Sequence, residues 1–108
     1  MGLFTTHRIT IKKNVIKTVG RQPVGSYEDL VDTDGNILVI PCRITRNDTA
    51  NQTFLFILKK YYELIGGDLH KNYQISIEGI TQTYVLVNEP LWGGGVRHHI
   101  EAVIQEMI

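Results

Sequence analysis

The sequence predicts a mainly β protein, a small closed or partly open antiparallel β-barrel with long loops and at most one short helix. Short segments in which apolar and polar residues alternate recur along the chain, and Gly, Pro, Asn and Asp gather between them. Only one segment shows the apolar spacing of a helix. Many short strands separated by turn signals are typical of small barrels.

The length and composition fit one such domain. A chain of 108 residues is expected to form a single domain, residues 1–108. Eleven basic residues balance eleven acidic ones, so the composition does not indicate a protein that coats nucleic acid. Cys42 is the only cysteine, and we expect it to be a small buried apolar residue, because a disulfide needs a second cysteine.

A half-buried strand is expected at residues 7–15. Ile9 and Ile11 share one face of this strand, and Arg8 and Lys12 point the other way. The pattern therefore places two basic side chains on the outer surface.

The segment Ile16–Asp29 is predicted to be a long mobile loop. It contains Gly20, Pro23 and Gly25 and shows no periodicity. Long loops in compact domains usually carry function or are disordered.

A hairpin is expected around Asp34-Gly35, because glycine takes positive φ without steric cost. The return strand should run from Ile37 to Thr45. Pro41 lies within it and lacks a backbone donor, so that position should be an edge or a bulge. The polar stretch "RNDTANQ" then predicts a loop.

The next segment fits two structures. Its apolar residues have helical spacing, and Gly66-Gly67 would end a helix: they are Phe54, Ile57, Leu58, Tyr61, Tyr62 and Ile65. The stretch "TFLFI" is also rich in the aromatic and β-branched residues typical of strands. Taken alone, the pattern slightly favours a helix.

Strands are expected again in the last third of the chain. Alternation and a turn at Gly79 predict a second hairpin over residues 72–88. Pro90 and Gly93–Gly95 should form a flexible link, and the last strand should run from Val96 to about Met107.

The adjacent histidines of this last strand raise the question of a catalytic or metal site. Side chains alternate on a strand, so His98 and His99 should point to opposite faces and cannot easily share one metal. We expect His98 to be partly buried, and His99 to lie with Arg97 and Glu101 on the solvent or partner face. The sequence contains no Walker loop and no nucleophile elbow, so neither an enzyme nor a bound cofactor or metal is expected.

One pattern of features covers the second half of the chain. It consists of a strand, a Gly turn, a Tyr-Val strand, a loop with an aromatic and glycines, two histidines and a closing strand. In this chain these are Ile75–Gly79, Tyr84–Val87, Trp92–Gly95, His98-His99 and Ile100–Ile104. The pattern resembles the small minor capsid proteins of tailed bacteriophages, which are head–tail connector components of the stopper, or head-completion, kind.

This resemblance implies a strand at Thr53–Leu58 with an irregular or short helical piece before Gly66, and we adopt that assignment. It also implies a structural virion protein whose barrels form a cyclic ring under the portal. Such a ring closes the channel after DNA packaging and docks the tail. The implied partners are other copies of the chain, the portal or adaptor ring and tail proteins. The implied location is the head–tail interface of the virion, after assembly in the bacterial host cytoplasm.

Two sets of residues are candidates for such an assembly. A cyclic ring needs two different complementary patches on each subunit. The candidate subunit-interface residues are Arg8, Lys12, Arg97, His99 and Glu101, although any one of these charged residues is more typical of an ordinary solvated surface. The candidate residues for the channel or a neighbouring ring are Lys17, Arg21, Gln22 and Pro23, of which the two basic ones favour contact with the phosphates of packaged DNA. No membrane partner is expected, because no apolar run approaches the ~18 residues of a span.

Two alternative functions stay open. An OB-like barrel that binds single-stranded nucleic acid would need exposed aromatic residues on a basic sheet face. The available aromatic residues are Phe54, Phe56, Tyr61, Tyr62, Tyr73 and Tyr84. Most of them fall on apolar faces and are expected in the core. A small phage adaptor or inhibitor of a host protein is the other alternative, since a fold does not determine a function.

Overall fold

The computed structural model of the chain describes residues 7–47, 49, 52–94 and 97–107. Within these residues the chain forms an eight-stranded sheet and one short helix. The elements in chain order are β1 (His7–Val19), β2 (Gln22–Asp29), β3 (Ile40–Asn47), β4 (Gln52–Leu58), α1 (Lys59–Leu64), β5 (Gln74–Ile77), β6 (Thr83–Leu86), β7 (Leu91–Gly93) and β8 (His99–Glu106).

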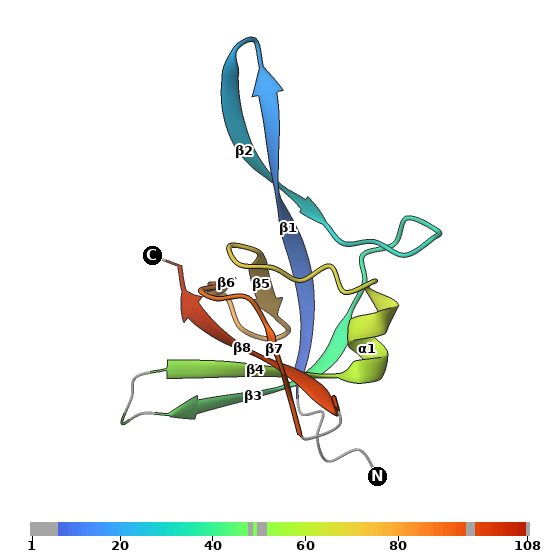
Figure 1. Cartoon of the computed structure of the whole chain (residues 1–108), viewed down its shortest axis with the longest axis vertical. Helices are drawn as coiled ribbons and strands as arrows, with labels where there is room; N and C mark the ends of the chain where they lie inside the picture. The colour runs from blue at the N-terminus through green and yellow to red at the C-terminus, as the bar shows by residue number, and fades with distance from the viewer. Residues whose placement is uncertain (1–6, 48, 50–51, 95–96, 108) are drawn as a thin grey trace.

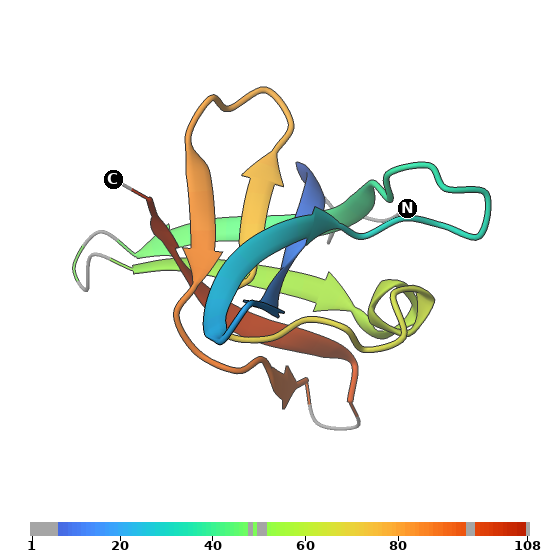
Figure 2. The ribbon, with the colours of Figure 1, turned by 90° about the horizontal axis from the view of Figure 1, so that it is seen from above.

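Six of the strands close into an antiparallel barrel, which confirms the predicted fold class. The order around the barrel is β1-β3-β4-β8-β6-β5, and β5 pairs with β1 to close it. Figures 1 and 2 show these strands wrapped around a common interior. Strands β2 and β7 lie outside the ring and pair with β1 and β8.

The barrel interior is filled by apolar side chains that alternate along each strand. Isoleucines from β1, β5 and β8 point inward as predicted, because one face of each of these strands is buried. Cys42 is fully buried among them, as expected for a lone cysteine. The core consists of Ile9, Ile11, Leu30, Ile40, Cys42, Leu55, Ile57, Ile65, Leu69, Tyr73, Ile75, Ile77, Leu86, Ile100, Ala102 and Ile104.

The segment with two candidate structures divides as the family resemblance implied. Its first half is β4 and its second half is α1, so the strand at Thr53–Leu58 and the helical turn after it are confirmed. Strand β4 lies between β3 and β8, which places Leu55 and Ile57 inside the barrel. A helix over the whole segment would leave β3 and β8 without this neighbour and its backbone hydrogen bonds.

The predicted loop at Ile16–Asp29 is instead most of a long β-hairpin, so this prediction was wrong. Strand β1 continues to Val19, a two-residue turn at Gly20-Arg21 follows, and β2 returns beside β1 with Asp29 opposite Lys12. Gly20 has a φ of 66°, which suits a tight hairpin turn. Figure 1 shows the hairpin projecting from the barrel. We call residues 13–28 the arm, because β5 accompanies β1 only as far as Lys12.

Pro23 lies within β2 without interrupting the hairpin. The N–H of Leu30 donates to the carbonyl of Ile11 at 2.9 Å, and hydrogen-bonded and non-hydrogen-bonded pairs alternate along an antiparallel ladder. Counted from that pair, Pro23 stands opposite Thr18 in a non-hydrogen-bonded pair. Its missing N–H would therefore point outward, away from β1, and no ladder bond is lost.

The hairpin expected around Asp34-Gly35 is shorter than predicted. Strand β3 begins at Ile40 rather than at Ile37, and residues 31–37 form a turn with a single bridge between Val31 and Ile37. The Asp32 carboxylate accepts two backbone hydrogen bonds in this turn, each at 2.9 Å. The residues that were predicted to form the first strand of this hairpin belong partly to β2, which pairs with β1 instead.

The remaining strands differ from prediction mainly at their ends. The hairpin over residues 72–88 is confirmed as β5 and β6. The predicted flexible link contains β7, whose Trp92 lies opposite Ile100 of β8. Strand β8 begins at His99, and Val96 lies outside the described residues, as does part of the predicted "RNDTANQ" loop.

A surface clasp joins the turn before β5 to the segment before β7. His70 Nδ1 lies 2.8 Å from Glu89 Oε1, and the Lys71 N–H donates to Glu89 Oε2 at 2.7 Å. The hydrogen bond with His70 is the main cause that lowers the pKa of Glu89, and the Lys71 N–H adds to it. The clasp therefore favours the ionised carboxylate in the folded protein.

Acid should weaken this clasp. Because the folded-state pKa of Glu89 is below the unfolded value of 4.5, its stabilising effect is present above that value and is lost as pH falls through the folded pKa. The Glu89→Gln variant should therefore lose less thermal stability than wild type as pH falls through and below 4.5. Melting temperatures measured from neutral pH to pH 3 check this, and identical acid slopes for the two proteins would contradict it.

Candidate functional site

The two histidines at the start of β8 contact each other. His98 Nδ1 lies 2.9 Å from His99 Nδ1, and His99 Nε2 lies 2.9 Å from Glu101 Oε1. His99 is largely covered, with 12% of its side chain exposed, while His98 is exposed. The expectation that His98 is partly buried and points away from His99 was therefore wrong.

His98 contacts His99 because of the backbone conformation just before β8. Opposite faces follow only if both histidines belong to one strand, and His98 precedes β8. Arg97 takes a φ of 49°, a left-handed conformation that turns the chain between β7 and β8. His98 N donates to the carbonyl of Gly93 at 3.1 Å, which closes the turn. The alternation predicted for the strand holds only from His99 onward.

An aromatic cluster surrounds this turn, and the sequence did not indicate it. Trp92 of β7 meets Tyr62 of α1 edge to face, with ring centroids 5.3 Å apart. The Arg97 guanidinium lies 5.5 Å from the centre of the Trp92 ring. Phe56 of β4 meets His99 at 5.6 Å. The glycines of "WGGGVR" were the available signal, because they allow such close packing.

Two of these glycines are needed where they stand. A Cβ on Gly93 would lie 2.7 Å from Glu101 Oε1 and 3.0 Å from His99 Nε2. A Cβ on Gly94 would lie 2.7 Å from the Cβ of His98, and Gly94 has a φ of 73°. The backbone at Gly93 and Gly94 can therefore pack closely against His98, His99 and Glu101 only because these two positions lack side chains.

Alanine at Gly94 should lower the free energy of unfolding by about 1–2 kcal/mol, because it combines a left-handed backbone with a steric clash. The matched control is Gly25→Ala in the arm, where the nearest atom to the new Cβ is Asn14 Oδ1 at 4.0 Å. That variant should keep its stability or gain about 0.4–1 kcal/mol through the unfolded chain. Urea unfolding measures both, and equal losses would contradict the role given to Gly94.

His98, His99 and Glu101 form a hydrogen-bonded chain at the start of β8. Across residues 7–47, 49, 52–94 and 97–107, no group of three or more His, Cys, Asp or Glu side chains is arranged to hold a metal. Both ring nitrogens of His99 already lie within hydrogen-bond distance of a neighbour.

Two phenylalanines of β4 lie half-buried on the outer surface of the barrel. Leu55 and Ile57 occupy the barrel interior, so Phe54 and Phe56 lie half-buried on the outer face, with ring centroids 6.4 Å apart. Arg43 stands opposite Phe56 on β3 and is exposed. These two phenylalanines are therefore exceptions to the expectation that most of the six aromatic residues lie in the core. Among the tyrosines, Tyr73 is buried, and the partly buried ones packed against the core are Tyr61, Tyr62 and Tyr84.

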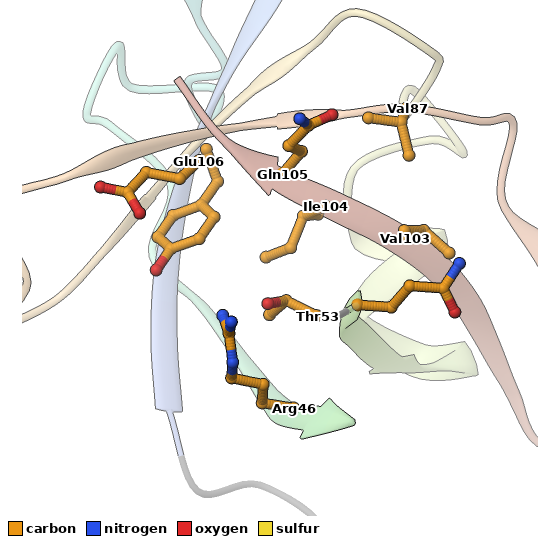
Figure 3. Close-up of a pocket in the computed structure, with 9 residues that line it drawn as sticks. Arg46, Thr53, Val87, Val103, Ile104, Gln105 and Glu106 are labelled. Atoms are coloured by element: carbon orange, nitrogen blue, oxygen red, sulfur yellow. The ribbon is translucent and has the colours of Figure 1, made fainter. Parts of the chain in front are cut away.

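An open cleft lies where the start of β4 meets the ends of β3, β6 and β8. Its volume is about 520 Å³, and its lining contains one base and one acid, Arg46 and Glu106. Figure 3 shows side chains from both β4 and β8 beside this space, including Thr53 and Ile104. The lining does not favour a ligand of either charge.

The predicted interface residues fall on two opposite walls of the barrel. Arg8 and Lys12 are on β1, while His99 and Glu101 are on β8, and these strands stand three positions apart in the six-strand order. Arg97 lies near the second group but contacts Trp92. The candidate channel residues lie together on the arm, around its turn: Lys17, Arg21, Gln22 and Pro23.

Fold and surface together define a small closed antiparallel β-barrel with a projecting two-stranded arm. Comparison with models of known protein families finds none that matches the chain, and comparison with curated proteins finds no matching sequence. No helix in the described part of the chain is long and apolar enough to cross a membrane.

Proposed function

We propose that this protein is a structural virion protein of a tailed phage, a ring-forming head–tail connector subunit of the stopper kind. The ring would lie between the portal or adaptor ring and the tail, around the path of the packaged DNA, and would close that path after packaging. The resemblance carried by Ile75–Ile104 supports this family. The structural observation that carries the proposal is the arm.

The arm exposes large apolar side chains that a solitary subunit would not be expected to leave uncovered. Ile16 is 71% exposed and Val19 is 66% exposed, and Val24 and Tyr27 are also exposed. A two-stranded ribbon is at best marginally stable in water on its own. Exposed apolar patches on a soluble protein mark surfaces that meet a partner. An assembly subunit whose arm is covered by other chains accounts for both features.

Removing the gene from the phage that carries it tests this role. Lysates without the protein should contain empty heads and free tails in electron micrographs, and supplying the protein from a plasmid should restore tailed, DNA-filled particles. Normal yields of DNA-filled, tailed particles without the protein would overturn the proposal. A complementing variant with only the arm shortened, residues 16–25 replaced by a two-residue turn so that Val15 still pairs with Ser26, should fold but fail to restore particles.

A second candidate is binding of single-stranded nucleic acid, and the outer face of β4 favours it. Phe54 and Phe56 lie side by side there with Arg43 next to Phe56, which combines two stacking surfaces with a positive charge. His99 and Glu101 border the same shallow surface, and Glu101 reduces its positive charge.

Fluorescence anisotropy with a labelled oligothymidylate separates the two functions. If this face binds bases, Phe56→Ala should weaken binding by about fivefold to more than a hundredfold, the effect of one lost stacking contact. Tyr27→Ala, which removes an exposed aromatic from the arm, should leave it unchanged. Absence of measurable binding by the wild-type protein at low salt would rule this candidate out.

A further inference from the structure

One face of the arm presents a narrow apolar strip. Ile16 pairs with Gly25, which has no side chain to cover it, and the diagonal neighbours of Ile16 on the same face are Pro23 and Tyr27. Val19 and Val24 add exposed apolar groups on the other face. Both faces of the arm therefore present apolar side chains that a partner could contact.

The outer edge of β2 does not favour pairing with another strand. The outward-facing positions of β2 are those in non-hydrogen-bonded pairs, and Pro23 occupies one of them without an N–H. A partner strand could not form a regular ladder across the distal half of this edge. On its β2 side, the arm must therefore make contacts mainly through its side chains.

The distal arm also has a definite charge. Residues 16–25 contain two basic residues, Lys17 and Arg21, and no acidic one. Arg21 is exposed in the turn at the tip. A surface that matches the arm should therefore combine exposed apolar groups with negative charge.

Such a surface exists at the base of the arm on the same chain. We call it the shoulder, and it consists of Val31, Asp32, Asp34, Ile37 and Leu64. Ile37 is 51% exposed and Leu64 is 60% exposed. Val31 and Ile37 are joined by a β-bridge, and Val31 and Leu64 line one shallow pocket of about 260 Å³. Residues 31–37 contain two acidic residues and no basic one.

The arm cannot cover the shoulder of its own chain. Figure 1 shows the arm pointing away from the barrel, while the turn at residues 31–37 leaves its base in another direction, on the same side as α1. The view from above in Figure 2 also places that turn and α1 on one side of the barrel. Because the arm is a paired β-ribbon, it cannot fold back within a few residues.

We infer that the arm of one copy docks on the shoulder of a second copy. The two surfaces are apolar at their centres, carry opposite charges and are different parts of the same chain, so the contact is heterologous and repeats from head to tail. This inference rests on the ring assembly of the proposed function and identifies the contact that builds it. Arg21 of one copy and Asp34 of the next supply the opposite charges at its rim.

Two complementary variants of the purified full chain test the contact. Ile16→Asp disables the arm and leaves the shoulder intact, and Leu64→Asp does the reverse. By sedimentation velocity and native mass spectrometry at high protein concentration, wild type should form oligomers and each variant alone should be monomeric, with association weakened at least about tenfold. An equimolar mixture should form heterodimers of twice the 12.3 kDa subunit mass and nothing larger.

Controls distinguish a lost contact from a damaged fold. Ile80→Asp changes an exposed isoleucine in the β5–β6 turn and should assemble like wild type. Circular dichroism should be unchanged in all variants. Arg21→Asp and Asp34→Arg should each weaken association, and the double variant should restore it.

Three outcomes would overturn the inference: a monomeric wild-type protein, oligomers of Leu64→Asp alone, or a mixture that remains monomeric. The phage experiment answers a different question. If the mixture forms the heterodimer but phage without the gene assemble normally, the head-to-tail contact stands and the proposed virion role fails. If the phage need the protein but the mixture remains monomeric, the role stands and this contact fails.

Discussion

Replacing Ile57 with alanine should lower the free energy of unfolding by about 2–5 kcal/mol. Ile57 is fully buried in β4 and stands opposite Ile100 of β8, in the middle of the barrel wall. The strands on both sides of β4 hold the backbone in place, so the interior cannot collapse into the space that the side chain leaves. Since domains of this size are stable by about 5–15 kcal/mol, the loss is a large fraction of the total.

The matched control is the same substitution at Ile16 of the arm. Ile16 is 71% exposed, so Ile16→Ala should change stability by no more than about 0.5 kcal/mol. Guanidinium unfolding followed by circular dichroism measures both variants. Equal losses would mean that the arm is part of the folded core, and a loss below about 1 kcal/mol for Ile57→Ala would contradict its place in the barrel interior.

The thiol of Cys42 should be almost inert in the folded protein. Burial raises its pKa from 9.0 to about 12, which lowers the thiolate fraction at pH 8 by about a thousandfold, a factor of ten for each pH unit. Because the thiolate is the reactive form and the side chain is fully buried, reaction with a disulfide reagent should require unfolding. At pH 8, the absorbance of the thiol that the disulfide reagent releases should show no reacted cysteine in native buffer and one per chain in guanidinium.

The same shift makes stability depend on pH in the alkaline range. Between pH 9 and about 12 the folded state keeps the Cys42 proton that the unfolded state loses, so the unfolding free energy falls as pH rises through this window. Cys42→Ala should remove this contribution and flatten the slope above pH 9, although it lowers stability at neutral pH by opening a small cavity. A native thiol that reacts at the denatured rate, or an unchanged alkaline slope, would contradict the burial of Cys42.

The resemblance to phage connectors and the geometry of the arm support the proposed role in different ways. The resemblance comes from the second half of the chain, around β5, β6 and β8, whereas the arm comes from β1 and β2. The head-to-tail contact can be tested by mutation, because Ile16 of the arm and Leu64 of the shoulder can each be changed without disturbing the barrel interior.

Strands with one buried face could be predicted from the sequence alone. Ile75 and Ile77 in β5, and Ile100 and Ile104 in β8, repeat at every second position because one side of each strand faces the barrel interior. The burial of Cys42 followed from its being the only cysteine, and the glycine at position 79 marked a real turn. These features depend on local spacing, which a single sequence records.

The candidate site depended on contacts between distant segments. The arm has both faces exposed, so its strands carry no apolar alternation, and only the pairing of Lys12–Val19 with Gln22–Asp29 identifies it as a hairpin. The sequence of β4 fits both helical and strand spacing, and only its pairing with β3 and β8 identifies it as a strand. The positive φ of Arg97 brought His98 against His99. The sequence by itself therefore determined the inward faces of β1, β5 and β8. Only the tertiary structure decided what the exposed faces and turns present to a partner, because hydrophobic alternation records burial in the chain's own core and nothing about surfaces that remain in solvent.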